Sequence, residues 1–134
     1  MKSRALWRSV FVMVAVIGFI GLLGNAPAVL AADKVVKVGN IEPLSGPSAS
    51  VGQQGKCARD LAVEEINAAG GIKSLGGAKI EMIYADSESK PEKGVAEAER
   101  LINTEKVHVL TGCWNSSVTY PTTAVAERYG IPFI

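Results

Sequence analysis

The hydrophobic residues of this chain follow two patterns. The segment Val10–Leu23 is a continuous apolar run without a charged residue. After Asp33, apolar residues either alternate with polar ones or recur every three to four positions, which is typical of strands and amphipathic helices respectively. The two patterns divide the chain into an amino-terminal segment, residues 1–32, and a globular remainder, residues 33–134.

The amino-terminal segment has the layout of a secretory signal. Basic residues precede the apolar run, and helix breakers followed by small residues come after it, as signal peptidase requires for a cut before Ala32 or Asp33. An uncleaved membrane anchor is the alternative, because Val10–Ala32 would nearly cross ~30 Å of hydrocarbon. We expect residues 1–32 to be a signal peptide that is removed on export.

The globular remainder alternates predicted strands with predicted helices. The order βαβαβαβ implies parallel strands joined by right-handed crossovers, so the fold class is α/β with a doubly wound parallel sheet. So few elements make an incomplete half of such a fold, and we expect a part of a longer protein. The predicted strands are Val35–Ile41, Lys79–Ala85, Val107–Leu110 and Ile131–Ile134, and the predicted helices are Gly52–Ala69, one starting at Pro91, and Ser117–Tyr129. In the first helix, Ala58, Leu61, Ala62, Ile66 and Ala69 are spaced as a buried face.

Charge and composition exclude several classes of function. Three of the 14 basic residues lie in the first 32 positions, so residues 33–134 carry 11 basic and 13 acidic residues and no basic patch for nucleic acid. The only histidine, His108, falls in a predicted strand, where a structural role is expected rather than a general base. Two separated cysteines and one histidine do not match a zinc site, and no cofactor is expected. Whether Cys57 and Cys113 pair is left open by the sequence.

Open α/β sheets bind ligands beyond the carboxyl ends of their strands. Two predicted loops lie there, Glu42–Val51 after the first strand and Thr111–Ser117 after the third. Ser116 or Ser117 would begin the third helix, where unpaired N–H groups and the helix dipole favour an anion. The alternative for such a serine is a plain helix cap, which contributes about 1 kcal/mol to stability.

An ordered set of short motifs resembles a known family. The set resembles type I periplasmic binding proteins, in particular the leucine/isoleucine/valine-binding proteins of branched-chain amino-acid ABC transporters. The motifs are Ser45-Gly46-Pro47, Gly52, AVEEINAAGGI over Ala62–Ile72, Asp86, Pro91 and TGCWNSSVTYP over Thr111–Pro121.

The resemblance implies a two-lobed soluble receptor that closes on its solute without a cofactor. Residues 33–134 would then be an incomplete N-terminal lobe. By position, Ser116 matches the family serine that holds a ligand carboxylate, and Ser117 extends the same polar loop. Trp114 matches a position that packs on the ligand, and Val51 stands where branched-chain receptors carry an aromatic residue.

The function expected from this resemblance is that of the periplasmic solute-binding component of an ABC importer, and not of an enzyme. Its solute would be an amino acid or a related small carboxylate or amide, and its partner an ABC permease in the inner membrane. A membrane-anchored, ligand-sensing receptor or regulatory domain on the same fold is the alternative. The Val51 and Trp114 positions leave the solute itself open.

Overall fold

The computed structural model describes residues 34–134, so the predicted signal peptide lies outside the described residues. Within this part of the chain, none of the helices combines the length and the apolar character that crossing a membrane would need. The elements are β1 (Val35–Glu42), α2 (Ala49–Ala68), a short 3-10 helix η1 (Lys73–Leu75), β2 (Lys79–Asp86), α3 (Pro91–Asn103), β3 (Val109–Gly112) and α4 (Ser116–Arg128).

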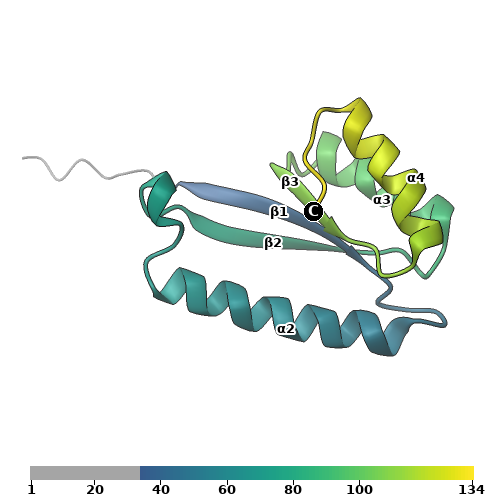
Figure 1. Ribbon diagram of the computed structural model, residues 1–134, viewed down its shortest axis with the longest axis horizontal. Helices are drawn as coiled ribbons and strands as arrows, with labels where there is room; N and C mark the ends of the chain where they lie inside the picture. Colours follow the sequence, from purple (N-terminus) through teal and green to yellow (C-terminus); the bar gives the residue numbers. More distant parts are fainter. Residues whose placement is uncertain (1–33) are drawn as a thin grey trace, which may run out of the picture. The chain divides into compact units, whose positions relative to one another are not determined.

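The sheet is parallel and is covered by helices on both faces. Its strand order is β2-β1-β3, and both pairs of neighbours run parallel. Helix α2 lies on one face, and α3 and α4 lie on the other (Figure 1). The starts of α2 and α4 are at the same end of the sheet, where β1 and β2 finish. The predicted doubly wound α/β arrangement is therefore confirmed.

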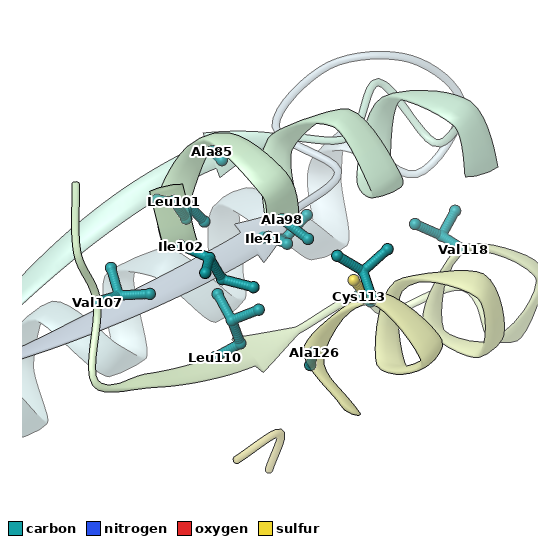
Figure 2. Close-up of a cluster of buried hydrophobic side chains, with 11 residues drawn as sticks. Ile41, Ala85, Ala98, Leu101, Ile102, Val107, Leu110, Cys113, Val118 and Ala126 are labelled. Carbon is teal, nitrogen blue, oxygen red and sulfur yellow. The ribbon is translucent and has the colours of Figure 1, made fainter. Parts of the chain in front are cut away.

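The main apolar core lies between the sheet and the pair α3 and α4 (Figure 2). Ile41 and Leu110 come from the sheet, Leu101 from α3 and Val118 from α4, and each of these side chains is fully buried. Burying a side chain of this size contributes roughly 1.5–3 kcal/mol. This core fixes where β1 and β3 end, and hence where the loops that follow them begin.

The predicted buried face of the first helix is wrong. Leu61 is 58% exposed and Ile66 is 41% exposed, and the three alanines predicted with them are exposed too. Helix α2 turns a more polar side to the sheet, because the sheet face that it covers carries polar groups. The Asn67 side chain bonds to both the N–H and the C=O of Ile80, and the Tyr84 hydroxyl donates to Asp60 Oδ1 at 2.7 Å.

Three boundaries also differ from the prediction. Helix α2 starts at Ala49, so Val51 lies in its first turn and not in the preceding loop. Strand β3 starts at Val109, because the positive φ of Lys106 still turns the chain just before it. The predicted fourth strand is reduced to one parallel bridge between Leu110 and Phe133. Proline has no N–H to donate, so Pro132 limits further pairing.

Candidate functional site

A single carboxylate organises the loop after β1. Oδ1 of Asp86, the last residue of β2, accepts hydrogen bonds from the backbone N–H groups of Leu44, Ser45 and Glu88 at 2.9, 3.1 and 2.8 Å. Burial disfavours the charge of Asp86, but hydrogen bonding to the Ser45 side chain and to these N–H groups outweighs it and lowers the pKa of Asp86 below its ordinary value. The loop between β1 and α2 is thereby tied to the end of β2.

A sharp turn after β3 directs the chain into α4. Gly112 and Cys113 have φ angles of 111° and 59°, so two consecutive residues occupy the left-handed half of backbone space. The Cys113 N–H donates to the C=O of Ile41 at 2.5 Å, which holds this turn against the end of β1. Burial raises the pKa of the Cys113 thiol to about 11, so at neutral pH this cysteine is an unreactive packing residue.

Helix α4 begins without a side-chain cap. Asn115 is the N-cap residue, but its side chain makes no capping hydrogen bond, and its buried Oδ1 has no partner within the described residues. Ser116 and Ser117 are the first two helical residues and both are exposed. The first N–H groups of a helix have no acceptor in the preceding turn. Val118 and Thr119 both donate to the C=O of Asn115, so the turn presents the N–H groups of Ser116 and Ser117 and their two hydroxyls at the positive end of the helix dipole.

The capping role considered for Ser116 does not fit this geometry. A cap precedes the first helical residue, and here Asn115 occupies that position while Ser116 is already helical. A helix N-terminus with uncapped N–H groups suits an anionic group such as a carboxylate.

An open pocket lies beside this turn. It has a volume of about 490 Å³, within the range of small-molecule sites. Val51 and Trp114 both line it, so the structure brings together two of the four residues predicted from sequence. Ser116 and Ser117 do not line it, but they follow Trp114 closely along the chain. The full lining is Glu42, Val51, Gln54, Gly55, Ala58, Arg59 and Trp114.

Two charged residues of the pocket were missed by the sequence prediction. The Glu42 side chain is only 4% exposed, and its Oε1 lies 2.7 Å from Nη1 of Arg59 on α2. Burial raises the pKa of Glu42, and the Arg59 charge partly opposes that rise. One signal was present in the sequence: Arg59 stands seven residues after Gly52 and four before Val63, which places the three on one side of a helix.

The remaining chemically active side chains have structural positions. His108 Nδ1 accepts a hydrogen bond from the N–H of Lys37, and the His108 N–H donates to the C=O of Lys37, so this histidine continues the pairing of β1 with β3. Cys57 is exposed, Cys113 is buried, and both are free thiols. No group of three or more His, Cys, Asp or Glu residues within residues 34–134 is placed to hold a metal ion. The described site is thus equipped to bind by hydrogen bonds, charge and apolar contact.

Known proteins resemble this chain in both sequence and structure. A family model described as "Periplasmic binding protein" matches residues 35–134. The Leu/Ile/Val-binding protein homolog 7 of Brucella suis biovar 1 is 37% identical over 112 residues, which are 84% of this chain and 26% of that protein.

Two solved structures show the same fold with a bound solute. The branched-chain amino acid transporter substrate-binding protein LivJ of Streptococcus pneumoniae, in complex with isoleucine, matches with a TM-score of 0.70 and 33% identity over 75% of this chain and 28% of its own. A solute-binding protein of an ABC transporter from Rhodopseudomonas palustris, in complex with 3,4-dihydroxybenzoic acid, matches with a TM-score of 0.66 and 28% identity over 74% of this chain and 26% of its own.

The chain spans about a quarter of the length of these relatives. Within that span, the match to the family model covers nearly all of the residues that the structure describes. The parallel α/β arrangement and the ordered motifs agree with that match, and the chain belongs to the periplasmic binding protein family.

Proposed function

We propose that this protein is the periplasmic solute-binding component of an ABC importer, and that it binds an amino acid or a related small carboxylate or amide. The observation that carries the proposal is the start of α4. There, two exposed serines with uncapped N–H groups begin two residues after Trp114, which lines a pocket of small-molecule size. An anion site next to an apolar wall is what a small carboxylate needs.

The binding mode follows from the positions of these groups. The Ser116 hydroxyl and the N–H groups of the first turn of α4 would hold the carboxylate. The body of the solute would lie against Trp114 and Val51, where burial of apolar surface contributes about 25 cal/mol per Å². The two relatives with known ligands support a site with one part for the carboxylate and another for the body of the solute. Isoleucine and 3,4-dihydroxybenzoic acid share a carboxylate, and the rest of each molecule differs.

The proposed function consists of reversible binding and release of the solute, without a chemical reaction. No nucleophile, base or metal takes part, and the solute leaves the protein unchanged. Residues 33–134 would form part of the N-terminal lobe of a two-lobed receptor, and the partner of the closed, solute-loaded receptor would be an ABC permease. The function is tested by whether the complete two-lobed receptor, called the full-length protein below, binds a small carboxylate reversibly and leaves it chemically intact.

Export provides a separate prediction. Because residues 1–32 carry a basic start, an apolar run and a small-residue exit, the mature protein should begin at Ala32 or Asp33. Intact-mass analysis of periplasmic material measures this directly. Recovery of the uncleaved chain in the membrane fraction would instead favour the anchored, ligand-sensing receptor.

A further inference from the structure

The pocket beside α4 has a charged pair at one side, which the carboxylate site does not explain. Glu42 is the last residue of β1, and Arg59 reaches it from α2. Helix α2 covers the face of the sheet opposite to α3 and α4 (Figure 1). Both residues line the pocket that Val51 and Trp114 also line. The pair therefore faces the space in which the body of a solute would lie.

Stability alone gives little reason for this pair. A buried ion pair costs about as much in lost hydration as it returns in attraction, so an apolar pair of similar size would serve packing as well.

The pair has hydrogen-bonding capacity left for a ligand. A guanidinium group carries five N–H donors, and the ion pair through Nη1 is the one polar contact of Arg59 with the rest of residues 34–134. The Arg59 side chain is 35% exposed and borders the pocket, so its other donors are accessible. The carboxylate of Glu42 can accept a hydrogen bond in turn.

The charge balance of the pair and the residues that line the pocket limit which solute group can bind there. Glu42 and Arg59 neutralise each other, so a neutral group that both accepts and donates is favoured over a second charge, which would be left unpaired. Trp114 is 66% exposed and offers a broad flat surface, and Gly55 and Ala58 add small apolar ones. A flat ring that bears a hydroxyl group satisfies both conditions.

We propose that the Glu42–Arg59 pair is the specificity element of the solute site, and that it selects carboxylates whose flat body carries a neutral hydroxyl at the end remote from the carboxylate. This inference rests on the proposed function, since it assumes that the carboxylate lies at the start of α4. The hydroxyl accepts from Arg59 and donates to Glu42 while the ring lies on Trp114.

Calorimetric titration of the full-length protein with matched solutes tests this. The probes are tyrosine against phenylalanine, 4-hydroxybenzoate against benzoate, and isoleucine. The wild type should bind the hydroxylated member of at least one pair roughly 10-fold or more tightly than its partner, because hydrogen bonds to charged groups contribute about 1.5–3 kcal/mol. Equal affinity within both pairs, or stronger binding of isoleucine than of any ring, overturns the inference and leaves solute binding itself intact.

A double variant assigns the discrimination to the pair. Glu42→Gln with Arg59→Met removes both charges together, so no buried charge is left unpaired. It should bind the hydroxylated solute roughly 10-fold more weakly and the unhydroxylated one unchanged. Lys56→Met is the control, because Lys56 pairs with Asp60 on the same helix and does not line the pocket. Persistence of the discrimination in the double variant, at a melting temperature near that of the wild type, would contradict the assignment. If no carboxylate binds to the wild type, the inference and the proposed function both fail.

Discussion

Replacing Ser116 by alanine should weaken solute binding by roughly 10- to 150-fold while the protein stays folded. The hydroxyl would donate a charge-assisted hydrogen bond to the solute carboxylate, and such bonds contribute about 1.5–3 kcal/mol. Ser116 is exposed and makes no capping bond, so its loss removes nothing that the fold needs. Affinity by calorimetry and stability by thermal melting, measured on the same variant, separate the two effects.

Ser74→Ala is the matched control for this experiment. Ser74 is also an exposed serine in a helical turn, but it belongs to η1, which does not line the pocket. Its affinity should equal that of the wild type. A Ser116→Ala variant with unchanged affinity, whatever its stability, would contradict the assignment of Ser116 to the carboxylate site.

Replacing Gly112 by alanine should have the largest effect on stability of any change considered. Gly112 has a φ of 111°, which L side chains rarely adopt, and an added Cβ would overlap the carbonyl oxygen of Ile41. Backbone strain and overpacking each cost about 1–3 kcal/mol, so unfolding should become easier by roughly 2–6 kcal/mol. Chemical denaturation of the full-length protein measures the change in the free energy of unfolding.

Gly70→Ala separates the two causes. Gly70 has a comparable positive φ of 102°, but nothing lies within 4 Å of an added Cβ. This control should lose only the cost of the left-handed conformation, about 1–2 kcal/mol. Similar losses in the two variants would mean that the turn after β3 is free to relax, and then it does not hold Trp114 and Ser116 in fixed positions.

The sheet could be predicted from sequence because its signals are local and regular. The alternation in Val35–Glu42 and Lys79–Asp86, and the helix between them, specify a parallel arrangement whatever the details of packing. The start of α4 could be placed to within one residue for the same reason. The position of Ser116 relative to a sheet edge then followed from topology alone.

The orientation of α2 could not be predicted in this way. Its alanines, Leu61 and Ile66 have the spacing of a buried face, but the sheet beneath the helix offers Glu42 and Tyr84, which need polar partners. The sequence shows a strand that ends in a glutamate and a helix that contains an arginine, and only the fold brings the two within 2.7 Å. The pairing of Glu42 with Arg59 is therefore a tertiary property that neither segment shows by itself.

The central claim is that this protein binds a small carboxylate solute, and calorimetric titration of the purified, unliganded full-length protein tests it most directly. The panel should contain isoleucine, phenylalanine, tyrosine, benzoate and 4-hydroxybenzoate, and each recovered solute should be checked by mass spectrometry. We expect at least one of them to bind at a single site with a Kd of about 10 µM or tighter, and to be recovered unchanged. Absence of binding heat for every carboxylate at millimolar concentration, or chemical conversion of a bound one, would contradict the account.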